Sequence, residues 1–145
     1  MRFGFVIMAL LAAACAQPPA SEDEPAASVT GTSSLTGVRW RLVELDGQPS
    51  IQGGGAREPH LRFDPDRVSG ATGCNTLGGG YEVTGARLRF GNLASTRMAC
   101  VEEDRMRQET RFVNALERAD RFAISGDTLT LFQGEVAVAV FVKGE

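Results

Sequence analysis

Apolar and polar residues alternate in several short stretches of the chain, and this two-residue period is typical of half-buried β-strands. In residues 38–42 the alternation places Trp40 on the inner face and both Arg39 and Arg41 on the outer face. The stretch 136–142 is apolar on both faces, which favours a central strand over an edge strand. The predicted strands are residues 38–42, 60–63, 67–70, 81–83, 87–90, 121–125, 128–132 and 136–142.

One helix is predicted over about residues 101–119, because acids occupy its first turn and apolar residues then recur at helical spacing. We interpret this apolar stripe as packing against the sheet rather than as a cofactor-binding motif. The fold class expected is α+β and β-rich: a single compact antiparallel sheet or partly closed barrel with one packed helix. The apolar stripe consists of Met106, Phe112, Val113, Leu116 and Ala119.

Composition limits the class of protein. A chain of 145 residues that is 43% hydrophobic can form one domain with a real core. With 15 Lys+Arg against 18 Asp+Glu, the net charge of −3 argues against a nucleic-acid-binding protein. The runs Gly53-Gly54-Gly55 and Gly78-Gly79-Gly80 lack the endings and spacing of phosphate-binding loops, so we assign neither to a nucleotide.

The N-terminal residues have the features of an export signal. Residues 1–14 combine Arg2, an apolar run too short to span a bilayer, and three alanines, which indicates a signal peptide rather than a buried first strand. Cys15 then follows, and residues 11–15 resemble the lipobox of bacterial lipoproteins, although Leu11 lies one position further from the cysteine than usual. An ordinary secretory signal with a spare thiol is the alternative. Residues 16–34 are rich in Pro, Ala, Ser and acids, so we expect a lipidated Cys15 with a flexible tether over 15–34 and a globular domain over 35–145.

Two cysteines remain inside the predicted domain. In an oxidising compartment, Cys74 and Cys100 are most simply interpreted as a disulfide. The alternatives are a reactive Cys100 thiol paired with His60, the single histidine, and a metal site formed by His60, Cys74 and Cys100. Neither alternative has a recognised nucleophile motif or paired ligand spacing, so we predict no catalytic residues, no metal and no cofactor.

Several motifs together resemble the META domain. They are the opening Gly37-Val38-Arg39-Trp40-Arg41-Leu42, the string Gly73-Cys74-Asn75-Thr76, Gly79-Gly80-Tyr81, Leu88-Arg89-Phe90, the run Ser95-Thr96-Arg97-Met98-Ala99-Cys100, then Glu109, Phe112 and Leu116, and finally Gly126-Asp127-Thr128-Leu129-Thr130-Leu131. The bacterial proteins of this kind are the HslJ-like heat-shock lipoproteins.

The resemblance implies a β-rich domain with one helix, tethered in the envelope and associated with envelope stress and novobiocin tolerance. It supplies no reaction. The resemblance also supports proximity of Cys74 and Cys100, because both belong to the family's motifs.

From their chemistry, we interpret the motif residues as structural: Asn75 and the glycines suit a tight turn, Tyr81 has an apolar body with a polar tip, and Thr96 can cap a turn. The structural set is Trp40, Gly73, Asn75, Tyr81, Thr96 and Phe112.

The alternation also places five arginines on the outer side of the sheet. If their strands are neighbours, the arginines form a face able to meet anionic lipid, lipopolysaccharide or an acidic partner. The alternative is a solvated face with intermixed acids, which we favour. The five residues are Arg39, Arg41, Arg62, Arg87 and Arg89.

The function expected is that of a monomeric, membrane-anchored envelope lipoprotein, on the periplasmic face of the outer membrane, that binds or supports rather than catalyses. The alternative is a small inhibitor or sequestering module, acting on an envelope hydrolase or a toxic small molecule, that uses a protruding loop such as residues 52–59 or an apolar cavity.

Overall fold

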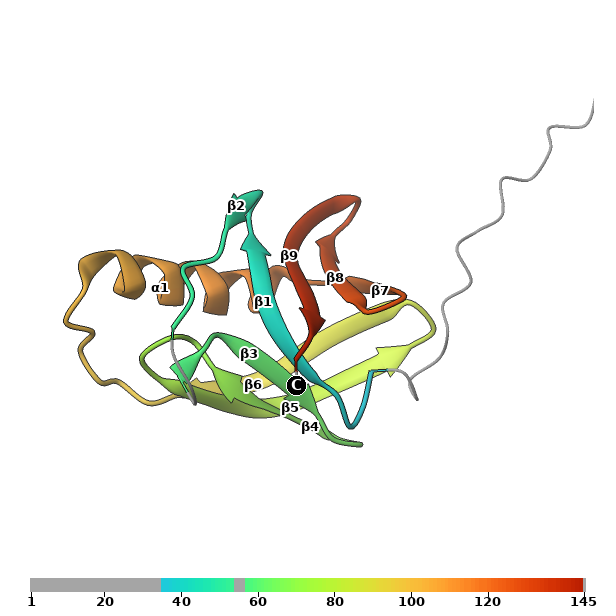
Figure 1. The fold of residues 1–145 in the computed structure, drawn as a ribbon. Coiled ribbons are helices and arrows are strands. Elements are labelled where there is room, and N and C mark those ends of the chain that lie inside the picture. The colour runs from blue at the N-terminus through green and yellow to red at the C-terminus, as the bar shows by residue number, and fades with distance from the viewer. Residues whose placement is uncertain (1–34, 54–56, 145) are drawn as a thin grey trace, which may run out of the picture.

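The computed structural model describes residues 35–53 and 57–144. The predicted signal peptide, Cys15 and the tether therefore lie outside the described residues. The described chain contains nine strands and one helix, α1 (Glu103–Arg118) (Figure 1). The strands are β1 (Arg39–Leu45), β2 (Gln48–Pro49), β3 (His60–Phe63), β4 (Arg67–Ala71), β5 (Thr76–Thr84), β6 (Arg87–Ser95), β7 (Arg121–Ser125), β8 (Thr128–Gln133) and β9 (Val136–Lys143).

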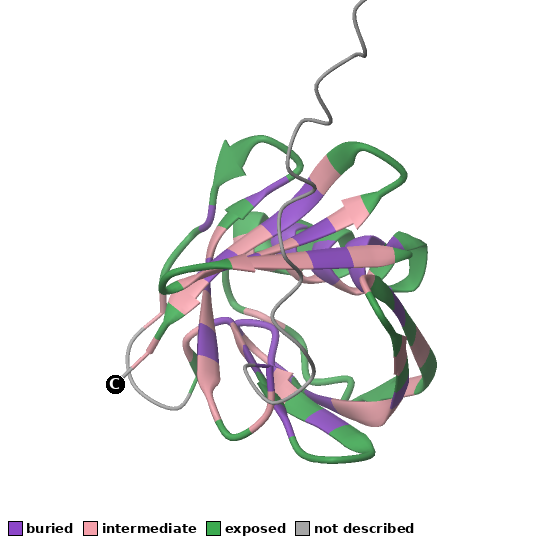
Figure 2. Ribbon diagram, turned by 90° about the vertical axis from the view of Figure 1, so that its right-hand side faces the viewer, coloured by how far each residue is buried: buried purple, intermediate pink, exposed green. Residues whose placement is uncertain are grey.

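The strands form one antiparallel sheet that curls into a ring. The order is β2-β1-β3-β4-β5-β6-β7-β8-β9, and an additional pairing between β1 and β9 closes the ring. Figure 2 shows this ring. The ring is not uniform, because β6 and β7 share only the register pair Arg87↔Arg121. The predicted partly closed barrel is confirmed, and β9 is a central strand as its apolar sequence indicated, paired with both β8 and β1.

Strand alternation explains which side chains form the core. Trp40 is fully buried, and its Nε1 donates to the carbonyl of Leu35 at 3.0 Å, which ties the first described residues to β1. Phe63 and Tyr81 stack edge to face with ring centroids 5.0 Å apart, and the Tyr81 hydroxyl donates to the Asp64 carbonyl at 2.6 Å. Tyr81 thus has the apolar body and bonded polar tip expected of it.

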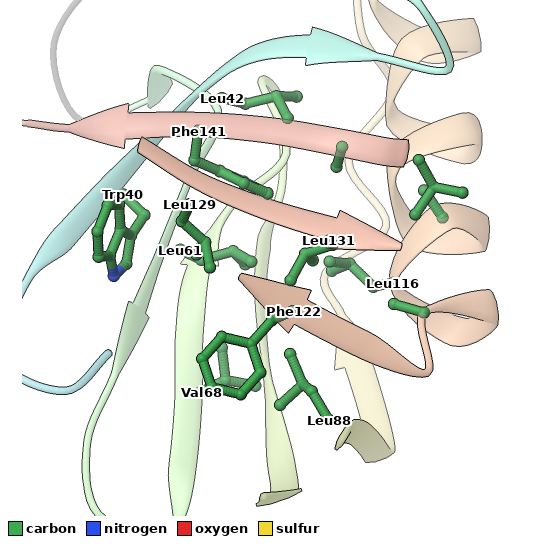
Figure 3. Packing of buried hydrophobic residues seen from close by; sticks show 14 of the residues in the cluster. Trp40, Leu42, Leu61, Val68, Leu88, Leu116, Phe122, Leu129, Leu131 and Phe141 are labelled. Atoms are coloured by element: carbon green, nitrogen blue, oxygen red, sulfur yellow. The ribbon is translucent and has the colours of Figure 1, made fainter. Parts of the chain in front are cut away.

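The helix packs against β1, β6 and β9 and contributes to the same core (Figure 3). Phe112, Ala115 and Leu116 are completely buried. The prediction was wrong at Met106, which lies about one and two-thirds turns before Phe112 and is 46% exposed. Gln108 is buried instead, because its amide bonds backbone outside the helix: Ile51 N–H donates to its Oε1 at 2.6 Å, and its Nε2 donates to the Ile51 carbonyl at 3.0 Å.

One glycine-containing segment differs from the prediction, and a second glycine has a steric role. Gly78, Gly79 and Gly80 do not precede a strand but lie within β5. Gly70 permits a close approach, since a Cβ atom there would lie 2.1 Å from the backbone oxygen of His60 on β3. Among the described residues, no helix has the length and apolar character needed to cross a membrane.

Candidate functional site

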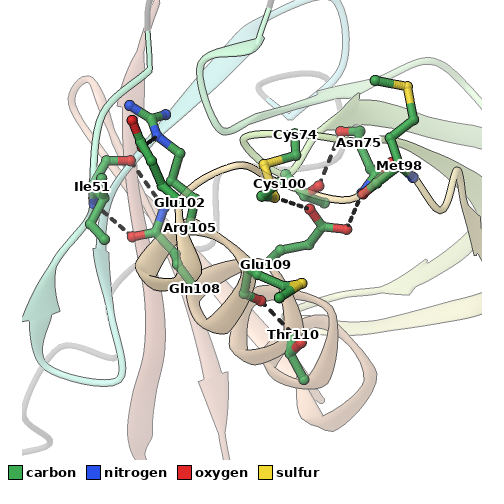
Figure 4. The surroundings of a disulfide bond; sticks show 12 residues. Ile51, Cys74, Asn75, Met98, Cys100, Glu102, Arg105, Gln108, Glu109 and Thr110 are labelled. Atoms are coloured by element: carbon green, nitrogen blue, oxygen red, sulfur yellow. Dashed lines mark hydrogen bonds and ion pairs between the residues drawn. A yellow bond between two sulfur atoms is a disulfide. The ribbon is translucent and has the colours of Figure 1, made fainter.

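The first candidate site is a group of residues around the disulfide that we call the disulfide cluster: Cys74, Cys100, Asn75, Thr96 and Glu109. Cys74 lies in the turn between β4 and β5, and Cys100 precedes α1. The two form the predicted disulfide, with their Cα atoms 5.7 Å apart (Figure 4). The bond therefore joins the Gly-Cys-Asn turn to the loop that leads into the helix.

Asn75 is the centre of this cluster and is only 4% exposed. Its Nδ2 donates to Glu109 Oε1 at 2.6 Å and to the Met98 carbonyl at 3.1 Å. Its Oδ1 accepts from the Met98 N–H at 2.7 Å and from the Thr96 hydroxyl at 2.8 Å. The amide thus uses both donor hydrogens and both acceptor sites, which is the maximum for this side chain.

The motif residues play slightly different roles from those expected. The left-handed position in the turn is Gly73, with φ of +118°, and not Asn75. Thr96 was expected to cap a turn, and its Oγ1 accepts from the Thr76 N–H at 3.1 Å, at the start of β5. The N-cap residue of the helix is Glu102. Sequence reasoning included Glu109 in the family pattern but missed its contact with Asn75, because the two residues are separated by 34 positions.

The disulfide cluster also bears on the metal and thiol alternatives. Glu109, and not His60, is the residue that joins the two cysteines, and the potential ligand atoms of Cys74, Cys100 and Glu109 lie within 4.8 Å of one another. Glu109 Oε2 is 3.8 Å from the Cys100 sulfur. While both sulfurs are in the disulfide, neither is a thiolate, so neither serves as a nucleophile or a metal ligand.

A cavity of about 250 Å³ opens beside the disulfide, between residue 53, residue 57 and the loop before α1. Arg57 and Arg105 supply positive charge to its wall, while Met98 and Val101 supply apolar surface. Met98 is 55% exposed, and Val101 is fully exposed. Arg105 is paired with Glu102, and its Nη2 donates to the Gln52 carbonyl at 3.2 Å.

The second candidate site lies on the outer face of the sheet, where three of the five predicted arginines meet. Arg39 on β1 is directly opposite Arg62 on β3, and Arg41 is opposite His60. Arg87 and Arg89 lie on β6, which is separated from β3 by β4 and β5. Glu82 on β5 is opposite Arg89. The five arginines therefore do not make one continuous face, and only Arg39, Arg41 and Arg62 come together.

A cavity of about 500 Å³ lies on this face, and we call it the outer-face cavity. Its polar lining residues come from four strands: Arg39, His60, Arg62, Ser69 and Thr76. Gly70, Ala71 and Leu77 complete its wall. Acids stand nearby, as the alternative interpretation of a mixed surface expected. Glu58 lies 3.7 Å from both Arg39 and Arg41, and Asp64 lies 3.8 Å from Arg62.

His60 is held in one orientation at this cavity. Its Nδ1 lies 2.7 Å from the Glu58 carbonyl and 3.3 Å from Arg39 Nη2. Because the carbonyl is the shorter contact and only accepts, Nδ1 carries the proton and donates to it. Burial lowers the pKa of His60, and the charge of Arg39 lowers it further, against the opposing effects of the Glu58 carbonyl and carboxylate. The neutral ring therefore leaves Nε2 as an acceptor.

Comparison with known proteins bears on the whole domain. A family model described as the META domain matches residues 33–145. One solved structure, an NMR structure of a protein, is 21% identical, covers 76% of this chain and 92% of that chain, and has a TM-score of 0.62. Another, an NMR structure of a protein from Burkholderia xenovorans, is 24% identical, covers 92% of this chain and 99% of that chain, and has a TM-score of 0.63. These two likenesses are in fold alone. Among curated proteins, none matches this chain.

Proposed function

The chain belongs to the META domain family, and from this membership we propose that it is an exported, lipid-anchored protein of the bacterial envelope that acts by binding rather than by catalysis. It acts as a monomer on the periplasmic face of the outer membrane, where it contributes to tolerance of envelope stress or of an antibiotic.

The observation that carries this proposal is the pairing of Cys74 with Cys100. The chain has three cysteines, so this pairing leaves only Cys15 as a free thiol. Cys15 directly follows the apolar and small residues of the leader, which is where a lipoprotein is acylated. A structural disulfide also suits an oxidising compartment outside the cytoplasm.

The arrangement of the motif residues favours binding over catalysis. Asn75, Thr96 and Glu109 are engaged with one another and with backbone, so their polar groups hold the loop before α1 in place. His60 belongs to the outer-face cavity, where it contacts Arg39 and the Glu58 carbonyl. The thiol–histidine pair considered from the sequence therefore receives no support from the contacts of either partner.

The decisive test is a mass spectrum of the mature protein isolated from envelopes. We expect a chain that begins at Cys15, carries acyl chains there, and lacks the two hydrogens that a disulfide removes. A Cys15→Ser variant should leave the membrane fraction, and it should fail to restore stress tolerance to a deletion strain that the wild type rescues. A chain that retains Met1 and three free thiols would overturn the proposal.

The second candidate function is an inhibitor or sequestering module. It is favoured by the fully exposed Val101 and the half-exposed Met98, which line the cavity beside the disulfide cluster. Such apolar side chains are typical of surfaces that contact a partner. Replacement of both by serine, with the fold intact and stress tolerance retained, would argue against this function.

A further inference from the structure

We infer that the outer-face cavity binds a doubly charged oxyanion of the phosphate class through Arg39 and Arg62, beside the His60 ring. This inference names the ligand class for the binding role, and it rests on the proposed function for its biological setting. The shared chemistry is a phosphate group, which reaches the cavity either as a lipid headgroup or as a soluble phosphate ester.

Sheet register brings the binding groups together from distant parts of the sequence. Arg39 is opposite Arg62 across the β1–β3 pair, and Arg62 is opposite Ser69 across the β3–β4 pair. Thr76 at the start of β5 is opposite Ala71, which is itself opposite His60. These four neighbouring strands, visible in Figure 1, thus present guanidinium, imidazole and hydroxyl groups on one rigid surface.

The charge at the cavity favours an anion. Two guanidinium groups line it, and its described lining contains no carboxylate. Glu58 and Asp64 approach the arginines only to 3.7 and 3.8 Å, distances longer than a hydrogen bond. The arginines therefore retain donors that the protein itself does not use.

The type of donor selects the class of anion. Guanidinium groups match phosphate and carboxylate oxygens in a two-point geometry, and hydroxyls of Ser69 and Thr76 add donors for a third or fourth oxygen. A tetrahedral oxyanion meets donors from several directions better than a planar carboxylate does. The adjoining Ala71 and Leu77 give the rest of the ligand an uncharged wall.

The test is a titration of the full-length Cys15→Ser chain, oxidised and free of an acyl anchor, with inorganic phosphate. Amide and side-chain NMR shifts should move at β1, β3 and β4. The double variant Arg39→Gln/Arg62→Gln should bind about tenfold more weakly or worse. The matched control, Arg87→Gln/Arg89→Gln, removes the same charge on β6 and should change the affinity less than about twofold. If the first variant does not fold, Arg62→Gln alone replaces it, because that side chain is half exposed.

Vesicles distinguish the two sources of phosphate. Binding of the same chain to phosphatidylcholine vesicles that contain phosphatidic acid, lost in Arg39→Gln/Arg62→Gln, identifies a headgroup. Binding of inorganic phosphate without vesicle binding identifies a soluble ester. Equal losses in both double variants, or no binding of either probe, would overturn the inference. A mature protein that is neither exported nor acylated but still binds phosphate here would overturn the proposed function alone.

Discussion

Replacing Asn75 by aspartate tests the disulfide cluster most sharply, because the change is nearly isosteric. An oxygen then takes the place of Nδ2, which lies 2.6 Å from Glu109 Oε1. Two charges at that separation repel by about 6 kcal/mol at an effective dielectric constant near 20. The protein has a less costly route, since placing a proton on one ordinary carboxyl at neutral pH costs about 4 kcal/mol. We therefore expect Asn75→Asp to lose about 4 kcal/mol of unfolding free energy at pH 7.

The pH dependence identifies the cause. The folded variant holds a shared proton that the unfolded chain releases at neutral pH, so its stability relative to the wild type falls as the pH rises. The loss should shrink by about 1.4 kcal/mol for each unit that the pH is lowered towards the range where free carboxyls protonate.

The assay is urea unfolding of the oxidised protein at pH 7 and pH 5. Glu109→Gln keeps an acceptor oxygen for Asn75 and should cost little. The double variant Asn75→Asp/Glu109→Gln should recover most of the loss, since the new amide can donate to the aspartate, while the Met98 carbonyl still lacks the donor that Asn75 supplies. A loss that is the same at both pH values, or that survives in the double variant, would refute the reasoning.

Three further changes test other parts of the structure. Cys100→Ser opens a bond between residues 26 apart and should lower the unfolding free energy by about 3–4 kcal/mol, measured by denaturant unfolding; a midpoint equal to that of the disulfide-bonded wild type would contradict this. Gly70→Ala should cost at least about 2 kcal/mol because its Cβ meets the His60 oxygen, whereas Gly91→Ala, with open space around it, should be nearly neutral; equal thermal midpoints would count against the close approach. The lowered pKa of His60 means that the unfolded state binds a proton first, so stability should decline as the pH falls below the usual histidine value, and a His60→Gln variant should lack this decline in urea unfolding. Because an oxyanion favours the protonated ring, sulfate affinity measured by calorimetry should rise as the pH falls through the same interval. The charged groups around His60 are Arg39, Arg41 and Glu58, whereas Ser69 and Ala71 on β4 carry no charge. Affinity that does not change with pH would contradict the role of His60.

Local pattern was sufficient to predict most elements of the fold. Alternation placed Trp40 inside and Arg39 outside because each strand has one face on a single core. The helix was predicted from spacing, yet Met106 is exposed and the polar Gln108 is buried. Spacing cannot reveal a buried Gln108, since the partner that makes its burial favourable is the Ile51 backbone, 57 positions away.

The candidate sites depended on strand order, which the sequence did not determine. The alternation correctly put the five arginines on outward positions, but their grouping required knowing that β4 and β5 lie between β3 and β6. From the sequence, His60 was considered as a possible partner of Cys74 and Cys100. Its place beside Arg39 follows only from the β1–β3 register. The disulfide was predictable because the compartment and the number of cysteines leave few pairings.

The position of the disulfide has a mechanical consequence for the ring. Residues 74–100 form a covalent loop that contains the whole β5–β6 hairpin, and this loop closes immediately before α1. The single register pair between β6 and β7 is the narrowest contact around the barrel. If thermal motion parts that seam, the disulfide still joins the open end of the β5–β6 hairpin to the segment that leads into α1, the helix that packs on β6.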